Sequence, residues 1–572
     1  MQKTNSPPTR EPLKKRWSIA AKISPEADQN LENYHPVLRQ ILFNRGYATT
    51  ESAQEFLRGG DTAPADQMLG IDAAVDRLIH AINTQEQVVV FGDYDTDGVT
   101  GTALMVQALR AAGAQVQAYI PNRFTEGYGL NNNALEMLKE GGAALVVTVD
   151  CGIRAFNEAE HASQIGLDLI ISDHHTTGSE LPPAVAVINP KQPGDPYPHK
   201  NLAGVGTAYK LACALLEKLS SNAVDPHALT DLVALGTVAD LVPLVGENRQ
   251  LVRQGLAQIW RKQRQGLLSL ISVARLKPEK VRARDIGFIL GPRLNAAGRL
   301  GSAMQAYDLL TAEDVFEAGR LAQALDNTNR ERQEVTGTMV ETSEELALKE
   351  GRDQPLLYAA HPDFNLGVVG LAASRLVERF YRPSIIAHQG EQVTRASCRS
   401  IPEFHITDAL DECADLLEHH GGHAAAAGFT VRNENAGALV EQLNAIAERQ
   451  LGDKDLQPVL NAEAEVPLKD LGAHLLEQLD WLEPTGYGNP EALFVSRDLK
   501  VSQSRAVGQE SSHLKLSVTD GWVTYDAIAF RQGHWHEKLP PRIDLLYSFE
   551  LNEFNGRRTL QLNVKDLHPS RA

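Results

Sequence analysis

From about residue 85 the chain alternates short, fully apolar runs with longer amphipathic stretches rich in Ala and Leu. A run that is apolar at every position is typical of a strand buried on both faces, and helices between such strands connect parallel neighbours. The pattern predicts a doubly wound α/β domain reaching to about residue 310. Its strands are expected at QVVVFG (87–92), VQAYI (116–120), ALVVTVD (144–150), LDLIIS (167–172) and AVAVIN (184–189).

Three other patterns surround this domain. Residues 311–349 are rich in helix formers and polar on every face in the middle, which predicts a long connecting helix. A smaller α/β domain follows, and alternating strands after about residue 494 predict a β-barrel of the OB type. We therefore divide the chain into an N-terminal arm with a helical segment (1–50), an α/β domain (51–310), a connecting helix (311–349), a second α/β domain (350–454) and a barrel domain (455–572).

Composition narrows the class of protein. The chain has 572 residues and 43% apolar content, which excludes disordered, collagen-like and coiled-coil proteins. Its four cysteines stand far apart without a CxxC pair, so neither a disulfide scaffold nor a zinc ribbon is expected. No apolar run approaches the ~18 residues of a membrane span, and the first residues lack the apolar core of a signal peptide. We expect a soluble cytoplasmic protein with no membrane partner.

The candidate chemistry lies where the predicted strands end. Asp93, Asp95 and Asp97 follow the first strand, Asp150 ends the third, and the run 173–175 (Asp-His-His) follows the fourth. Ligands of open parallel sheets bind beyond the carboxyl ends of the strands. Several carboxylates gathered there repel one another unless cations neutralise them, and oxygen ligands with one or two imidazoles suit Mn²⁺ or Mg²⁺. This pattern predicts a two-ion site for metal-assisted phosphoester hydrolysis.

Each of these residues also has a simpler interpretation. A single Asp at a strand end, such as Asp150, is often a helix N-cap, and a His pair in a loop, such as His174 and His175, is usually solvated surface. The coincidence of three acidic strand ends favours the metal site over these alternatives.

The motifs DYDTDG (93–98), VDCG (149–152) and DHH (173–175) resemble, in this order, those of the DHH phosphoesterase superfamily. A fourth motif of the superfamily matches at ALGTVADLVPL (234–244). Further segments resemble the bacterial RecJ exonuclease family within it: LAGVGTAYK (202–210), GPRLNAAGRLG (291–301), CRS (398–400), GGHAAAAGF (421–429) and EPTGYGNPEALF (483–494). The resemblance implies a DHH domain, a connecting helix, a DHHA1 domain and a carboxyl-terminal OB-fold. It also implies a 5′ to 3′ exonuclease specific for single-stranded DNA that releases 5′-mononucleotides in recombination and repair, uses Mn²⁺ or Mg²⁺, and has single-strand-binding protein as a partner.

The resemblance also assigns roles to residues of the first domain. It implies that Asp150 bridges two ions and that Asp93 and Asp173 are further candidate ligands. In smaller relatives a His stands where this chain has Phe91, and Asp93 would compensate. His175 is expected to contact either a metal or the scissile phosphate. The remaining metal ligands implied are Asp95, Asp97, His174 and Asp240.

Substrate contacts are expected outside the acidic motifs. The chain carries a net charge of −18, yet residues 249–299 hold twelve Lys or Arg against two acidic residues, a basic patch that predicts phosphate contacts. Arg293 and Arg299 flank a predicted small-residue turn that begins at Asn295, and this turn is expected to hold a phosphate.

In the second domain, Gly421 and Gly422 are expected to lead into an Ala-rich helix start that binds a phosphate beside His423, with Ser397 and Arg399 nearby. Arg123 and Tyr128 are expected to clamp or stack on the strand, although Tyr128 fits a core position equally well.

Two other functions fit parts of the pattern. The chain could be a DHH-family phosphodiesterase for short oligonucleotides or cyclic dinucleotides, but a small substrate needs no OB-fold. It could also be a non-catalytic replication scaffold, but such a protein would lose the metal carboxylates that this chain keeps.

Overall fold

The computed structural model describes residues 13–60, 62–220, 224–349, 351, 354–554 and 556–570. The first twelve residues of the expected N-terminal arm lie outside this part of the chain. The chain forms two compact units. One contains the residues up to Ser18 with Arg330–Asn461, and the other contains Ile19–Asn329 with Ala462–Ala572.

The expected parallel sheet is confirmed in the second of these units. Its five strands lie in the order β3-β2-β4-β5-β6 and all pair in parallel. They are β2 (Gln87–Gly92), β3 (Gln115–Tyr119), β4 (Ala143–Val149), β5 (Asp168–Ser172) and β6 (Ala186–Ile188).

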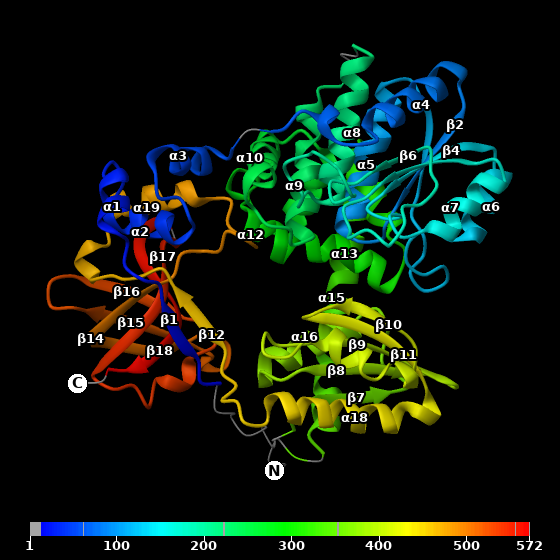
Figure 1. The fold of residues 1–572 in the computed structure, drawn as a ribbon. Helices are drawn as coiled ribbons and strands as arrows, with labels where there is room; N and C mark the ends of the chain where they lie inside the picture. Colours follow the sequence, from blue (N-terminus) through cyan, green and yellow to red (C-terminus); the bar gives the residue numbers. More distant parts are fainter. Residues whose placement is uncertain are drawn as a thin grey trace. The chain divides into compact units, whose positions relative to one another are not determined.

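Helices cover both faces of this sheet (Figure 1). In β2, Val88 and Val90 pack into one core and Val89 and Phe91 into the other, because successive side chains of a strand point to opposite faces. The first core includes α4 (Ile71–Thr84), α5 (Thr96–Ala111), α8 (Gly204–Lys218) and α9 (Thr230–Ala239), and the second includes α6 (Asn132–Glu140) and α7 (Phe156–Gln164).

A helical extension completes this domain. It runs through α10 (Gly246–Arg261), α11 (Gln265–Val273), a π-helical segment (Ile286–Leu290), α13 (Gly291–Leu300) and α14 (Met304–Thr311). The predicted connecting helix is α15 (Val315–Ala347).

The predicted OB barrel is confirmed at the carboxyl-terminal end. Five strands pair in the order β14-β15-β16-β18-β17, and β17 pairs with β14 to close the barrel. They are β14 (Phe494–Val507), β15 (His513–Thr519), β16 (Thr524–Ala529), β17 (Arg542–Phe554) and β18 (Arg557–Pro569).

The N-terminal helices pack on this barrel domain although most of the chain separates them in sequence (Figure 1). Leu38, Leu42 and Phe56 share a buried cluster with Leu475 and Phe494. The helices involved are α2 (Pro36–Asn44), α3 (Thr50–Arg58) and α19 (Ala473–Leu479), and Leu31, directly after α1 (Pro25–Asn30), also belongs to the cluster.

The other unit has a mixed sheet in the order β10-β11-β9-β8-β7, in which only β7 and β8 are parallel. The strands are β7 (Leu357–His361), β8 (Ser384–Gln389), β9 (Val393–Arg399), β10 (Leu417–His423) and β11 (Ala426–Arg432), with helices α16 (Val369–Phe380), α17 (Ile406–Asp411) and α18 (Asn433–Leu451).

The helix start expected after Gly422 is wrong. Residues 421–429 lie in the β10–β11 hairpin, in which Gly422 pairs with Ala427. Alanine favours helices in isolation, but here β11 pairs along its whole length with β9, and this tertiary pairing overrides the local preference.

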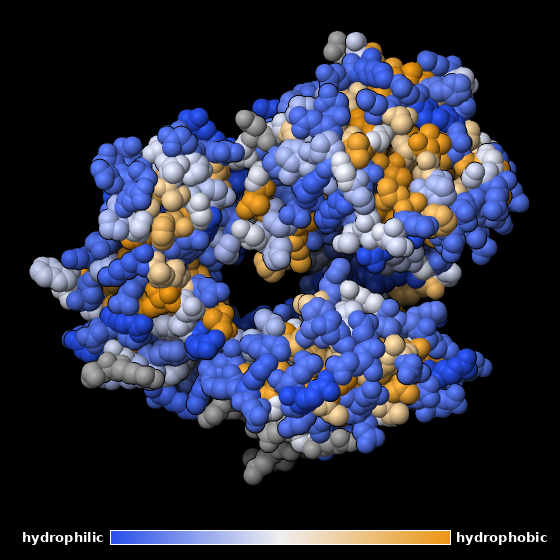
Figure 2. All heavy atoms as spheres, viewed as in Figure 1, coloured by the Kyte–Doolittle hydropathy of each residue, from blue (hydrophilic) through white to orange (hydrophobic). Residues whose placement is uncertain are grey.

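Across the described residues, no helix has the length and apolar character required to cross a membrane. On the face drawn in Figure 2 most of the surface is hydrophilic, and apolar residues appear in several separate patches.

Candidate metal centre

The acidic residues predicted at the strand ends meet at one edge of the parallel sheet. β2, β4 and β5 are neighbours, so the segments that follow them emerge side by side, and Asp240 joins them from the end of α9. Their ligand atoms form three groups, each with all atoms within 4.8 Å of one another: Asp93, Asp95 and Asp150; Asp97, His174 and Asp240; and Asp150, His174 and His175. Asp150 and His174 each belong to two groups, so the groups form one continuous centre.

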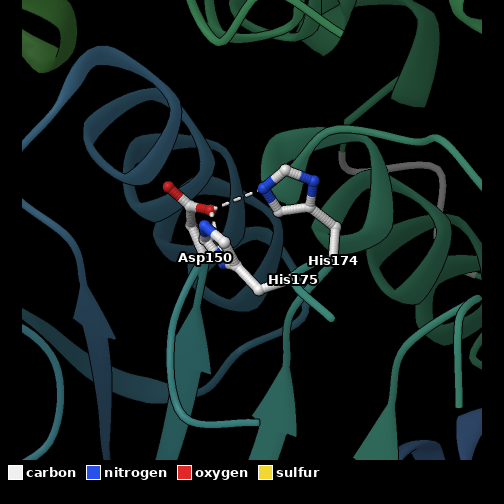
Figure 3. Close-up of side chains that lie close together, drawn as sticks. All are labelled: Asp150, His174 and His175. Carbon is white, nitrogen blue, oxygen red and sulfur yellow. Dashed lines mark ion pairs between the residues drawn. The ribbon is translucent and has the colours of Figure 1, made fainter. Parts of the chain in front are cut away.

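Asp150 lies at the middle of this centre. Its Oδ1 is 3.1 Å from Nε2 of His174 and 3.8 Å from Nδ1 of His175, and both imidazoles turn toward it (Figure 3). Nε2 of His174 is also 3.6 Å from Oδ2 of Asp240. The backbone of Asp150 has a φ of +64°, a conformation that L-residues rarely adopt and that recurs at functional sites. A Cβ on Gly204 would stand 2.6 Å from Cβ of Asp150, so only glycine fits there.

Backbone N–H groups hold the first acidic motif in place. Asp95 caps α5 and accepts hydrogen bonds from the N–H groups of Asp97 (2.8 Å) and Gly98 (3.2 Å). Asp97 is buried and accepts from the N–H groups of Gly204 (2.7 Å) and Val205 (2.8 Å) at the start of α8. Gly204 and Val205 were not among the residues predicted from the sequence to support the site. Their position at a glycine-rich helix start in the 202–210 motif was the available signal.

Asp173 differs from the other candidate ligands because it belongs to none of the three groups. Its Oδ1 accepts hydrogen bonds from the backbone N–H groups of His174 (2.7 Å) and His175 (3.1 Å) and lies 2.8 Å from Nδ1 of His175. Its Oδ2 accepts from the N–H of Ile153 at 2.9 Å. Asp173 therefore fixes the backbone of His174 and His175 and the ring of His175.

Several buried polar atoms of the centre have no hydrogen-bond partner among the described residues. They are Oδ1 of Asp93, Oδ1 of Asp150 and Nε2 of His174, and the last two approach to 3.1 Å without hydrogen-bond geometry. A buried polar group without a partner is costly, and carboxylate oxygens with imidazole nitrogens are ligands that Mn²⁺ accepts. The donor set fits divalent cations.

The electrostatics of the centre support the same conclusion. Burial and the neighbouring Asp95 raise the pKa of Asp97 to about 7, and burial with Asp97 and Asp95 raises the pKa of Asp240 to about 9. Burial, followed by Asp97, raises the pKa of Asp150 well above its ordinary value. Burial and the adjacent His175 lower the pKa of His174 to about 3, which keeps its imidazole neutral. Protein groups alone thus disfavour the carboxylate charges, and a cation would reverse this.

Arg123 and Tyr128 lie beside the centre. The ring of Tyr128 is 6.4 Å from that of His175 and 6.1 Å from that of Tyr94, and the guanidinium of Arg123 is 4.9 Å from the centre of the Tyr94 ring. Tyr128 is 56% exposed, which excludes the alternative that it is a core residue.

The predicted turn at 295–298 is wrong, because these residues lie inside α13. Gly298 is there for close packing, since a Cβ would stand 2.4 Å from the carbonyl oxygen of Tyr94. Oδ1 of Asn295 accepts hydrogen bonds from the N–H (2.7 Å) and hydroxyl (2.8 Å) of Thr96, which lies between the candidate ligands Asp95 and Asp97. Arg293 pairs with buried Asp326 at 3.0 Å, and Arg299 lies at the end of the same helix.

Most cations of the basic run 249–299 already contact protein oxygen atoms. Arg249 is fully buried, so it does not contribute to the predicted basic patch on the surface. The others are Arg253 with Leu57, Lys262 with Glu279, Arg264 with Asp231, Lys280 with Glu553, Arg282 with Asp480 and Glu483, and Arg293 with Asp326. These contacts show that many of the basic residues in the run hold other segments of the protein in place.

The candidate phosphate contacts of the other unit lie on its mixed sheet. Nη1 of Arg399 donates to Oγ of Ser397 at 3.0 Å on β9. A Cβ on Gly370, at the start of α16, would stand 2.9 Å from Arg399 and 3.0 Å from Ser397. His423 pairs with Ala426, which pairs with Arg399, so the three lie at one level of the sheet.

Family models match three parts of the chain: "DHH family, N-terminal domain" at residues 87–237, "DHHA1 domain" at 353–449 and "RecJ OB domain" at 462–566. The chain is 40% identical to the single-stranded-DNA-specific exonuclease RecJ of Bacillus subtilis over 97% of this chain and 71% of that protein. It is 36% identical to the Escherichia coli protein of the same name over 93% of this chain and 96% of that protein.

Solved structures agree with these matches. The crystal structure of RecJ from Thermus thermophilus in complex with Mn²⁺ matches with a TM-score of 0.84 and 30% identity, over 97% of this chain and 80% of that one. The same protein with Mg²⁺ matches with a TM-score of 0.79 and 29% identity, over 97% and 79%.

Proposed function

Because the chain belongs to the RecJ family, we propose that it is a Mn²⁺- or Mg²⁺-dependent exonuclease that digests single-stranded DNA. The observation that carries this proposal is the buried centre in which Asp150 is shared between two groups of metal-ligating residues. Family relationship alone would leave open whether this chain kept the catalytic residues.

The groups suggest how two ions would be held. Asp93, Asp95 and Asp150 would hold one, and Asp97, His174 and Asp240 the other. Asp150 is the candidate shared by both ions, since its Oδ1 lies 3.1 Å from Nε2 of His174. When bound, such a pair lowers the pKa of a water and neutralises charge on the phosphate.

Protein groups would complete the site. Asp173 orients His175 through Nδ1, which leaves Nε2 of His175 for the substrate. Burial lowers the pKa of His175 and the Asp173 carboxylate raises it, with a net upward shift that favours the imidazolium. We therefore assign His175 to the scissile phosphate and Asp173 to positioning.

Substrate contacts outside the centre are part of the proposal. Tyr128 is exposed beside His175, and the half-buried Arg123 lies over the ring of Tyr94, an arrangement suited to clamping or stacking on a strand of any sequence. Ser397, Arg399 and His423 are proposed phosphate contacts in the second unit, and Arg293, Asn295 and Arg299 near the acidic loop.

Several further features are proposed on the motif resemblance alone: 5′ to 3′ polarity, release of 5′-mononucleotides, action in recombination and repair, and single-strand-binding protein as a partner. The four free cysteines support a reducing, cytoplasmic location. We keep the boundaries at 310, 349 and 454, but extend the N-terminal segment to Arg58 and begin the first α/β domain at residue 59, because α3 packs with the barrel core.

Digestion of a strand of about 40 nucleotides, several times the length that one OB-fold covers, tests the function. Strands labelled at either end should lose the 5′ label first as mononucleotide, with Mn²⁺ or Mg²⁺ present, and the matching duplex should resist. Preferred cleavage of a dinucleotide would instead support the small-substrate alternative, and loss of the 3′ label first would reverse the polarity. Absence of hydrolysis with either ion would support the scaffold.

A further inference from the structure

The segment 481–490, which leads into the barrel domain, packs on the loop that follows Asp240. The backbone N–H of Leu244 donates a hydrogen bond to the carbonyl oxygen of Tyr487 at 2.8 Å. The segment covers most of the EPTGYGNPEALF motif (483–494), and nothing in the proposed chemistry uses this motif. Its contact is with a stretch only three or four residues beyond a candidate metal ligand.

Two glycines make this approach possible. Gly488 has a φ of +72°, and a Cβ on it would stand 2.8 Å from Cβ and 3.0 Å from Cα of Pro243. A Cβ on Gly486 would stand 2.8 Å from Cδ1 of Leu244. The backbone of the segment therefore lies directly against Pro243 and Leu244, and any side chain at position 488 would push the two apart.

Arg249 holds the segment from the other side. This arginine is fully buried on α10, and its Nη atoms donate to four successive carbonyl oxygens: those of Trp481 (2.8 Å), Leu482 (2.8 Å), Glu483 (2.9 Å) and Pro484 (3.2 Å). Its Nε donates to the carbonyl oxygen of Phe56 on α3 at 3.0 Å. The planar guanidinium, with five donors in fixed directions, ties three distant parts of the chain together.

The loop between Asp240 and α10 is fixed by the same contacts. Leu241 adopts a φ of +61°, so the chain turns sharply directly after Asp240. Nδ2 of Asn248 donates to the carbonyl oxygens of Pro243 (3.1 Å) and Asn201 (2.6 Å). The end of α9 positions Asp240 from one side, and this loop, pressed by the segment 481–490, positions it from the other.

We propose that the segment 481–490, clamped by Arg249, is a positioning element for the metal ligand Asp240. The attachment of the barrel domain thereby determines whether the group of Asp97, His174 and Asp240 can hold its ion. This inference rests on the proposed function, because it takes Asp240 to be a ligand.

The test is the binding of Mn²⁺ to the full chain, followed by calorimetry and by the spin-coupled signal of an ion pair. Gly488→Ala should lower the affinity for one of the two ions about tenfold, the usual effect of losing a contact that supports a metal ligand. The affinity for the other ion should not change. Asp240→Asn should lower the affinity for the same ion further.

The matched control is Gly521→Ala in the barrel domain. Gly521 also has a positive φ (+97°), but a Cβ there meets nothing within 4 Å. The substitution introduces similar backbone strain without the contact and should leave both ions bound as in the unaltered chain.

Three results would count against these ideas in different ways. Unchanged binding of both ions by Gly488→Ala would overturn the inference. So would equal loss of both ions, because the segment would then support the whole fold and not Asp240. Failure of the unaltered chain to bind either Mn²⁺ or Mg²⁺ would overturn the proposed function itself.

Discussion

The acidic strand ends and the basic run 249–299 are both clusters of like charge, but they differ in whether their charged groups find hydrogen-bond partners within the protein. Asp93 and Asp150 are buried with oxygen atoms that find no hydrogen-bond partner among the described residues. Arg249 is buried as deeply, yet it donates to five carbonyl oxygens. The first cluster needs a ligand from outside the chain, and a large part of the second is satisfied within it.

The comparison shows what a run of charge can and cannot indicate. Carboxylates accept hydrogen bonds but cannot neutralise one another, so gathering them requires cations. Arginine can be satisfied by backbone carbonyls, which every segment offers. A basic run in sequence is therefore weaker evidence for a polyanion site than an acidic cluster is for a metal.

The largest expected effect comes from the shared acidic ligand. Asp150→Asn should lower the rate of DNA hydrolysis about a thousandfold or more, because both ions lose a ligand, while binding of single-stranded DNA persists. The hydrolysis rate is measured with Mn²⁺ present, and DNA binding is measured by fluorescence anisotropy. Asp76→Asn, on an exposed residue of α4, should change neither. Full activity of the Asp150 variant would remove the basis of the two-ion site.

The next effect is on stability. Arg249→Met should lower the free energy of unfolding by about 3 kcal/mol or more, since five carbonyl oxygens lose a buried donor. Urea denaturation measures it. Arg261→Met, on an exposed residue of the same helix, should change the free energy of unfolding by no more than about 0.5 kcal/mol. Similar small values for both variants would mean that the clamp contributes little.

Metal binding should depend on pH, with affinity changing about tenfold per pH unit for each proton that the ion displaces. In the metal-free protein, Asp97 with a pKa of about 7 and Asp240 with a pKa of about 9 hold protons at pH 6, and Mn²⁺ must displace them. Affinity should rise from pH 6 to pH 9, and calorimetry in buffers of different ionisation enthalpy should detect released protons. His174, with a pKa of about 3, contributes none. Affinity independent of pH would contradict the raised pKa values.

The smallest effects separate two neighbouring arginines of the basic run. Arg282 pairs with Asp480 and Glu483 at the surface, and Arg284 is exposed. Arg284→Ala should reduce the slope of log affinity for single-stranded DNA against log salt by about 0.7, the value for one phosphate contact. Arg282→Ala should leave that slope unchanged and lower stability by at most about 1 kcal/mol. A reduced slope for Arg282→Ala and an unchanged slope for Arg284→Ala would instead indicate that Arg282 contacts the DNA.

Much of the fold could be predicted because its signals are local. All five strands of the parallel sheet lie at the expected apolar runs, and the long helix and the barrel follow their patterns. The errors lie where distant contacts override local preference. GGHAAAAGF forms a hairpin because β9 pairs with it, and the predicted turn at Asn295 is helical because Gly298 packs on Tyr94.

The sequence by itself determined which carboxylates and imidazoles stand at the ends of strands, since a strand's length and direction place the residues that follow it. Only the tertiary structure decided that Asp173 fixes the ring of His175, that Arg249 is a buried clamp and that the segment 481–490 presses on the loop after Asp240. The physical reason is that hydrogen-bond partners and close approaches depend on which distant segments meet, and no local pattern of residues records that.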